Sequence, residues 1–236
     1  MELSEADVWS RLGRLYDSVA GTVERAVRAG SVPAVVSGDC TVSIGLTAGL
    51  QRAGLDASVV WFDAHGDVQT LETTTSGYLG GMALRLLVGY RPELVSERLG
   101  LRPPAEERVV LVDARDLDPA ELEYLASARL RRSTVEELSA EILPAGPLLL
   151  HIDLDVVDPA ELPGLRYPAS DGPDAAAVLR AARTVVDSGQ VVALHIACCW
   201  HPGRADPDGV REHLVTTLLT SLWERPDYNS RTEPPQ

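Results

Sequence analysis

Acidic and imidazole side chains follow directly on an apolar run in the segment Val59-Val60-Trp61-Phe62-Asp63-Ala64-His65-Gly66-Asp67. The apolar residues predict a buried strand, and Gly66 loosens its exit. Because strand residues alternate between faces, Asp63, His65 and Asp67 project to one side if the extended conformation continues. Carboxylates at the end of a buried strand need compensation, and a divalent cation is the simplest one. Carboxylate oxygen and neutral imidazole suit Mn, Fe or Zn.

A second apolar run also ends in acids, in the segment Leu148-Leu149-Leu150-His151-Ile152-Asp153-Leu154-Asp155. Asp153 and Asp155 are two positions apart and share a face of an extended chain. Either segment alone is equally compatible with an aspartate that caps the next helix or starts a turn. The two segments together favour a site at the strand-end edge of an α/β sheet, to which two buried strands deliver paired acids.

The composition limits the class of protein. With 236 residues and 45% apolar content, we expect one globular domain over residues 1–236, with a disordered tail from about residue 225. The net charge of −14 argues against a nucleic-acid or anionic-membrane partner. We expect a cytoplasmic protein, because the three cysteines do not form a disulfide framework and no signal peptide or 18-residue apolar run is found.

Strand and helix patterns alternate along the chain, and their order decides the fold class. The predicted strands are 33–36, expected to be buried, 59–62, 108–113, 148–153 and 191–196. The predicted helices are 5–29, 43–53, 81–87, 119–127, 134–141, 174–187 and 209–223. This order predicts an α/β fold with three layers and a doubly wound, mainly parallel sheet.

Four segments, in this order along the chain, are similar to motifs of one enzyme family. They are Ser37-Gly38-Asp39-Cys40-Thr41, Asp63-Ala64-His65-Gly66-Asp67, Ala114-Arg115-Asp116-Leu117-Asp118-Pro119-Ala120-Glu121 and Asp153-Leu154-Asp155-Val156-Val157-Asp158-Pro159. They resemble Gly-Gly-Asp-His-Ser, Asp-Ala-His-x-Asp, Arg-Asp-x-Asp-Pro-x-Glu and Asp-x-Asp-x-x-Asp-Pro of the arginase/agmatinase (ureohydrolase) family. The resemblance implies an arginase-like fold and covers about residues 33–200. The chain is short for that family.

The resemblance implies a binuclear Mn²⁺ site. The implied ligands are Cys40, Asp63, His65, Asp67, Asp153 and Asp155. Asp63 and Asp153 would bridge both ions, and Asp67 and Asp155 are the expected catalytic carboxylates. The implied chemistry is attack of metal-bound hydroxide on a guanidinium carbon, which gives urea and an amine.

Three further positions align with substrate-binding residues of arginases. Gln69 falls on the asparagine that meets the α-carboxylate, Ser76 on the serine that assists it, and Asp118 on the aspartate reached from the α-amino group. Each residue alone is an ordinary polar loop residue. Together they indicate an amino-acid-like substrate in preference to agmatine.

The chain departs from the family at three positions. Cys40 replaces a histidine ligand, and a soft thiolate shifts the preference from Mn²⁺ toward Zn, Fe or Co. The alternative is that Cys40 is a small buried residue and one ion is held weakly. Gly80 replaces the histidine that shuttles protons, and Cys198 replaces the glutamate that holds the guanidinium group. Conceivable substitutes are His195, His201 and Tyr78, each of which is otherwise a structural or solvent-facing residue.

Two functions from different classes follow from these observations. The first is a metal-dependent amidinohydrolase that cleaves a guanidine or amidine C–N bond on an amino-acid-like small molecule, such as Nω-hydroxyarginine or another modified arginine. The second is a non-catalytic arginase-like protein that binds metal or ligand. Hydrolysis of an acyl-amine bond on the same metal framework is a third alternative. Family members often form trimers or hexamers, so a homo-oligomer is expected.

Overall fold

The computed structural model describes residues 5–201, 203, 206 and 208–223, and the predicted tail from about residue 225 lies outside them. Within the described residues, six strands form one sheet in the order β1-β6-β5-β2-β3-β4, and all paired neighbours are parallel. The strands are β1 (Ala34–Ser37), β2 (Ser58–Asp63), β3 (Val109–Asp113), β4 (Arg131–Ser133), β5 (Leu148–Asp153) and β6 (Val191–Ala197).

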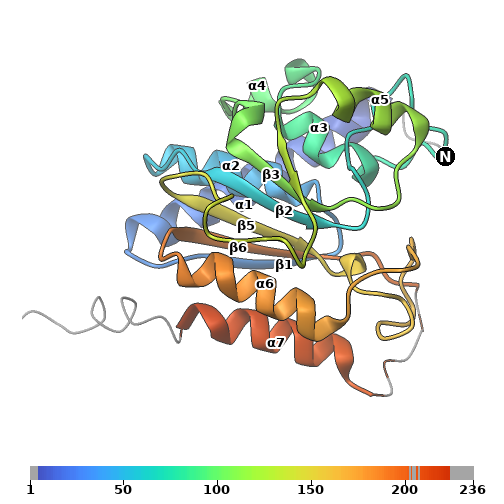
Figure 1. Cartoon of the computed structure of the whole chain (residues 1–236). Coiled ribbons are helices and arrows are strands. Elements are labelled where there is room, and N and C mark those ends of the chain that lie inside the picture. Colours follow the sequence, from blue (N-terminus) through green and yellow to red (C-terminus); the bar gives the residue numbers. More distant parts are fainter. Residues whose placement is uncertain (1–4, 202, 204–205, 207, 224–236) are drawn as a thin grey trace, which may run out of the picture.

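Helices cover both faces of the sheet (Figure 1). The helices are α1 (Glu5–Arg28), α2 (Val42–Arg52), α3 (Ala83–Leu87), α4 (Ser96–Leu99), α5 (Pro119–Ser127), α6 (Ala175–Asp187) and α7 (Val210–Trp223). Residues of α1 to α5 pack in one apolar cluster and residues of α6 and α7 in a second. The predicted three-layer, doubly wound α/β fold is confirmed, and none of the described helices is long and apolar enough to span a membrane.

The alternating side chains of β2 enter both apolar clusters. Val59 and Trp61 belong to the cluster on the α1–α5 face, whereas Val60 and Phe62 belong to the cluster on the α6–α7 face. All four side chains have no solvent-exposed surface. Because both faces of the strand are buried, its sequence is a continuous apolar run and does not alternate with polar residues.

Local sequence signals set the starts of two helices that flank the site. Asp118 and Glu121 form a capping box at α5, where Pro119 occupies the first turn. At α6, the side chain of Asp174 accepts a hydrogen bond from the backbone nitrogen of Ala177 at 2.6 Å. These caps confirm the predicted starts of both helices.

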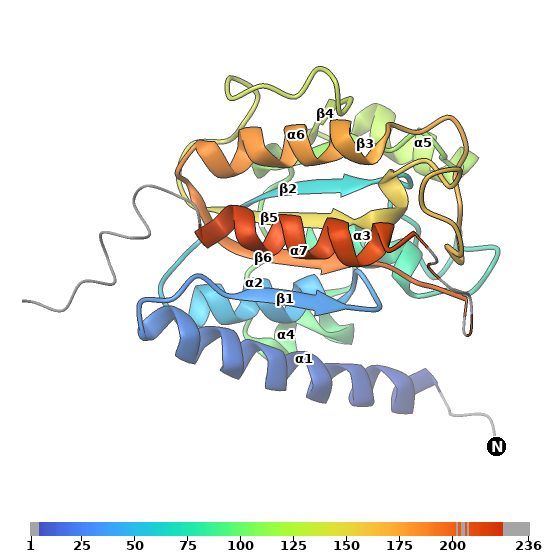
Figure 2. The same ribbon diagram turned by 90° about the horizontal axis from the view of Figure 1, so that it is seen from below.

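Two predicted elements differ from the structure. The strand at 33–36 is present as β1, but it pairs only with β6 at the edge of the sheet, so Val36 is 54% exposed where a buried strand was predicted. Figure 2 shows β1 at this edge. The helix predicted at 134–141 is absent, and turns occupy that region after β4. Its apolar residues Val135 and Leu138 pack under the sheet without helical hydrogen bonding.

The strand order reverses between β2 and β5. From β2 the chain moves outward to β3 and β4, then returns to β5 on the other side of β2 and continues to β6. Ligands of open α/β sheets bind at such a reversal, in the crevice beyond the carboxyl ends of the strands. The two strands at this point end in Asp63 and Asp153.

Candidate metal centre

The bridging carboxylates predicted from the sequence lie side by side. Phe62 of β2 pairs with Ile152 of β5, so the next residues, Asp63 and Asp153, end adjacent strands. They are 1% and 7% exposed, respectively. The extended conformation stops there, because a 3₁₀ turn begins at Leu154 and the backbone nitrogen of Asp155 donates to Asp153 Oδ1 at 3.0 Å.

Turns, and not a continued strand pleat, therefore bring the remaining acids to the site. Asp67 has a φ of +53°, in the left-handed region that few non-glycine residues adopt. Such a conformation persists only where the surroundings impose it, and it is found often at functional sites. These acids lie together in the structure, but the extended conformation on which their expected shared face depended ends at Asp63 and Asp153.

His65 lies between two carboxylates. Its Nδ1 is 3.3 Å from Asp63 Oδ1 and 3.2 Å from Asp155 Oδ2, and donor atoms of these three residues lie within 4.8 Å of one another. Burial disfavours the imidazolium, but hydrogen bonds to Asp155 and Asp63 outweigh it and raise the pKa of His65 to about 12. The geometry suits one cation held by one imidazole and two carboxylates.

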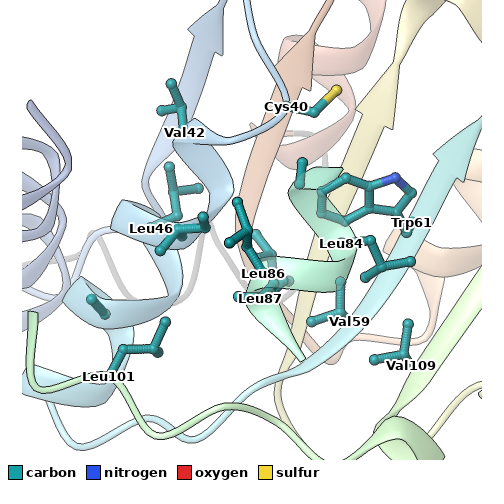
Figure 3. Close-up of a cluster of buried hydrophobic side chains, with 14 of the residues drawn as sticks. Cys40, Val42, Leu46, Val59, Trp61, Leu84, Leu86, Leu87, Leu101 and Val109 are labelled. Atoms are coloured by element: carbon teal, nitrogen blue, oxygen red, sulfur yellow. The ribbon is translucent and has the colours of Figure 1, made fainter. Parts of the chain in front are cut away.

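Cys40 also contacts the paired carboxylates. It follows β1, is 5% exposed, and its Sγ donates to Asp153 Oδ2 at 2.9 Å. Figure 3 shows Cys40 and the indole of Trp61 at the end of the apolar cluster toward which the strand arrows point. Donor atoms of Cys40, Asp63 and His151 form a second group within 4.8 Å of one another.

The electrostatics of these groups fit a bound cation. Burial, followed by the neighbouring carboxylates, raises the pKa of Asp67 and Asp153 well above its usual range and that of Asp155 to about 6. Burial and Asp153 likewise raise the pKa of the Cys40 thiol. In addition, Asp67 Oδ2 is buried and has no hydrogen-bond partner among the described residues. A divalent cation would give this oxygen a partner and favour the ionised forms.

Trp61 belongs to the apolar run that predicts strand 59–62, and it has a second role that the sequence analysis missed. The indole Nε1 donates to Asp63 Oδ2 at 3.1 Å, and the ring stacks on His151 with centroids 3.6 Å apart. Trp61 therefore orients one of the carboxylates predicted to bind metal. The spacing of two positions between Trp61 and Asp63 in a strand, which puts both side chains on one face, was the available signal.

A cavity of about 200 Å³ opens at this centre. Its walls include every site residue predicted from the sequence, namely Cys40, Asp63, His65, Asp67, Gln69, Ser76, Asp118, Asp153 and Asp155. Gln69 Nε2 donates to Asp118 Oδ2 at 2.7 Å, and Gln69 Oε1 accepts from Thr73 Oγ1 at 2.7 Å. Gln69 and Asp118 thus lie in contact on the cavity wall, Ser76 lines the same cavity, and the role of all three stays a prediction.

Tyr78 and the two adjacent cysteines lie near the positions at which the chain departs from the family motifs. Tyr78 Oη lies 2.9 Å from both Asp39 Oδ2 and Cys199 Sγ, and the Tyr78 ring stacks against Tyr167. Tyr78, Tyr167 and Cys199 line the cavity, whereas Cys198 packs in the apolar core. Of the conceivable substitutes for the missing groups, Tyr78 alone lines the cavity; His195 is fully buried and His201 is exposed.

Comparison with known proteins gives consistent similarities. The sequence profile described as "Arginase family" matches residues 4–221. Arginase from Bacillus subtilis (strain 168) is 31% identical over 169 residues, which are 66% of this chain and 57% of that protein. N(omega)-hydroxy-L-arginine amidinohydrolase from Streptomyces lavendulae is 35% identical over 159 residues, 66% of this chain and 56% of that protein.

Solved structures show the same similarity. The crystal structure of arginase from Bacillus subtilis subsp. subtilis superposes with a TM-score of 0.81 at 27% sequence identity, and the match covers 95% of this chain and 82% of that one. In the sequence comparisons, the chain spans little more than half the length of the two curated relatives.

Proposed function

The chain belongs to the arginase family, and we propose that it is a metal-dependent amidinohydrolase acting on a modified arginine such as Nω-hydroxyarginine. The observation that carries this proposal is the shared cavity. Potential ligands for two cations and three polar groups suited to an amino-acid frame line one pocket at the strand-order reversal. Such convergence of perturbed acids and polar groups is typical of an active site.

The proposed cations are held by Cys40, Asp63, His65, Asp67, Asp153 and Asp155. When bound, they supply Lewis acidity and lower the pKa of water. Mn²⁺ suits the carboxylate-rich donors, and Zn, Fe or Co suits the thiol of Cys40. Asp67 and Asp155 are the proposed catalytic carboxylates: the first has an oxygen without a hydrogen-bond partner, and the second is in contact with His65.

The amino-acid end of the substrate is proposed to contact Asp118, Gln69 and Ser76. The carboxylate of Asp118 attracts an α-ammonium group, while the Gln69 amide and the Ser76 hydroxyl can donate to an α-carboxylate. The contact between Gln69 and Asp118 supports this arrangement, because it orients both groups before a ligand arrives.

The part of the cavity wall formed by Tyr78, Tyr167 and Cys199 supports a substrate that is less basic than arginine. Tyr78, Tyr167 and Cys199 form this part of the lining and carry no formal charge. The carboxylate beside them, Asp39, accepts a hydrogen bond from Tyr78 and is not among the residues that line the cavity, so a strongly basic guanidinium meets neutral groups there. An N-hydroxyguanidine is less basic and can exchange hydrogen bonds with a phenol and a thiol. The similarity to the Streptomyces lavendulae amidinohydrolase supports the same substrate class.

The test is product analysis of purified protein supplied separately with Mn²⁺, Co²⁺, Zn²⁺ and Fe²⁺. With Nω-hydroxyarginine, water adds to the guanidine carbon and the C–N bond breaks, so hydroxyurea and ornithine should form in equal amounts. Arginine should react more slowly, and Asp155→Asn, which removes one anionic oxygen at similar size, should remove activity. If no urea, hydroxyurea or amine appears from any guanidine with any of these metals, the proposal is wrong.

The second candidate function is that of a non-catalytic binding protein of the same family. The uncharged lining that Tyr78, Tyr167 and Cys199 give this part of the cavity favours it. Metal binding and ligand binding without turnover would support this function, and turnover would exclude it.

A further inference from the structure

We propose that His151 is a metal ligand, and that its Nε2 joins Cys40 Sγ and an Asp63 carboxylate oxygen in a sulfur–nitrogen–oxygen position that selects Zn²⁺ or Co²⁺ over Mn²⁺. This inference rests on the metal centre of the proposed function but not on hydrolysis. The inference adds His151 to the proposed ligands. His151 lies inside β5, two positions before Asp153, where the sequence pattern of a buried strand does not indicate a ligand.

The three groups are close and shielded from water. Donor atoms of Cys40, Asp63 and His151 lie within 4.8 Å of one another, which is the spacing of ligands around one small cation. The three residues are 5%, 1% and 0% exposed, respectively. Of the two ring nitrogens of His151, Nδ1 contacts His195, while Nε2 is buried and has no hydrogen-bond partner among the described residues.

A chain of hydrogen bonds sets the tautomer of His151. We assign the Ser37 hydroxyl as the donor to the Asp39 carbonyl, 2.9 Å away. With this assignment, His195 Nε2, 2.8 Å from the same hydroxyl, donates to Ser37. His195 Nδ1 then accepts from His151 Nδ1 at 2.8 Å. This places the proton of His151 on Nδ1 and leaves a lone pair on Nε2.

Both imidazoles are neutral in this arrangement. In the hydrogen-bond chain from Ser37 to His151, each ring carries one proton, on His195 Nε2 and on His151 Nδ1. A neutral imidazole whose Nδ1–H is held by a second group is the usual state of a metal-binding histidine. His195 and Ser37 therefore serve as positioning residues for His151.

A purely structural role accounts for only part of this geometry. Stacking against Trp61 explains the position of the His151 ring, with the two planes 22° apart. It does not explain a buried nitrogen lone pair without a donor, which is unfavourable in a protein interior. A cation satisfies the lone pair. A thiolate, an imidazole and one carboxylate form a softer donor set than carboxylates alone, which is the basis for selecting Zn²⁺ or Co²⁺.

The test is titration of metal-free protein with Co²⁺ and Zn²⁺, comparing wild type with His151→Gln. Sulfur-to-cobalt charge-transfer absorption reports the thiolate, and its loss in Cys40→Ser assigns the band. We expect His151→Gln to weaken metal binding at this position at least about 100-fold. Loss of a residue that only orients a ligand costs about 10–100-fold, so a larger loss indicates direct coordination. The exposed His213→Gln is the matched control and should bind as wild type does.

Unchanged Co²⁺ affinity and an unchanged spectrum in folded His151→Gln would overturn the inference. If His151→Gln does not fold, Zn-edge X-ray absorption of the His65→Gln protein replaces it, because removal of His65 leaves His151 as the imidazole of the proposed centre. Sulfur and imidazole scattering in one spectrum is then expected, and sulfur with oxygen alone would overturn the inference. Neither readout requires turnover, so an inactive protein that coordinates through His151 refutes only the proposed function.

Discussion

The ring of Tyr78 occupies the space that a side chain at Gly80 would enter, because a β-carbon built on Gly80 overlaps that ring. The same tyrosine donates its hydroxyl to Asp39 Oδ2 at 2.9 Å and contacts Cys199 Sγ. Position 80 is where the family's loop histidine aligns. The phenol of Tyr78 therefore occupies the space next to position 80, and the small size of Gly80 is what makes room for the Tyr78 ring.

This steric match predicts strong coupling between positions 78 and 80. Gly80→Ala should destabilise the protein by about 1–3 kcal/mol, because the added methyl group displaces a packed ring. Gly81→Ala is the matched control and should be near neutral, since a β-carbon there meets no atom within 4 Å. Urea unfolding measures both. Gly80→Ala should cost much less in a Tyr78→Ala background, and equal costs in the two backgrounds would contradict the match.

The metal-free protein should lose stability as pH rises from 5 to 8. Burial raises the folded-state pKa of Asp155 to about 6, and hydrogen bonds to carboxylates, opposed by burial, raise that of His65 to about 12. Both groups therefore hold protons more tightly when folded. Their stabilisation is complete below the unfolded pKa values and is lost as pH rises toward the folded ones.

We expect this loss to be about 3 kcal/mol between pH 5 and 8. Urea unfolding in a chelator measures it, and saturating Zn²⁺ should remove or reverse the trend, because the cation favours the ionised acids. The control is Asp155→Asn without metal, which should show a shallower pH dependence. If stability instead increases from pH 5 to 8 in the chelator, the folded-state pKa values of these groups are not raised and the prediction is wrong.

Replacement of Trp61 by phenylalanine should weaken metal binding without dismantling the fold. The substitution keeps an aromatic ring beside His151 but removes the hydrogen bond from Nε1 to Asp63 Oδ2. Loss of such an orienting contact costs about 10–100-fold in metal affinity. Isothermal titration with Zn²⁺ measures the change. Trp9→Phe, at a buried tryptophan of α1, is the control for loss of indole volume and should bind with wild-type affinity.

The three cysteines should differ in reactivity toward iodoacetamide at pH 8 in the metal-free protein. Burial raises the pKa of all three thiols, but Cys199 is partly exposed while Cys40 and Cys198 are buried. Cys199 should therefore be alkylated first, as measured by peptide mass spectrometry. In urea the three should react alike. Preferential labelling of Cys40 in the folded protein would mean that its site is open to solvent.

Asp118→Asn should affect recognition of the α-amino group more than the chemistry. Asparagine keeps the cap of α5 but removes the negative charge beside Gln69. We expect KM for an amino-acid substrate to rise about 10–100-fold, because the loss of a hydrogen bond to a charged group costs about that much in binding. The change in kcat should be smaller. A substrate analogue without the α-amino group is the matched control and should show no such change. Equal effects on both compounds would remove Asp118 from substrate recognition.

Much of the fold and of the candidate site follows from local sequence patterns. The apolar runs before Asp63 and Asp153 predict the two central strands, because burial on both faces requires uninterrupted apolar residues. Asp118 followed by proline predicts the start of α5 because capping depends only on neighbouring residues. The motif order along the chain indicated the family and the residues that line the cavity.

Tertiary structure alone decided the features that depend on contacts between distant residues. The edge position of β1, the choice of Cys199 over Cys198 as a cavity wall, and the absence of a helix at 134–141 depend on which elements pair or pack. The state of His151 depends on His195 and Ser37, and those two partners are 158 positions apart in sequence. Periodicity determines the local conformation and the face of a side chain. It carries no information on which distant group meets that face, so the lone pair of His151 became visible only in the folded chain.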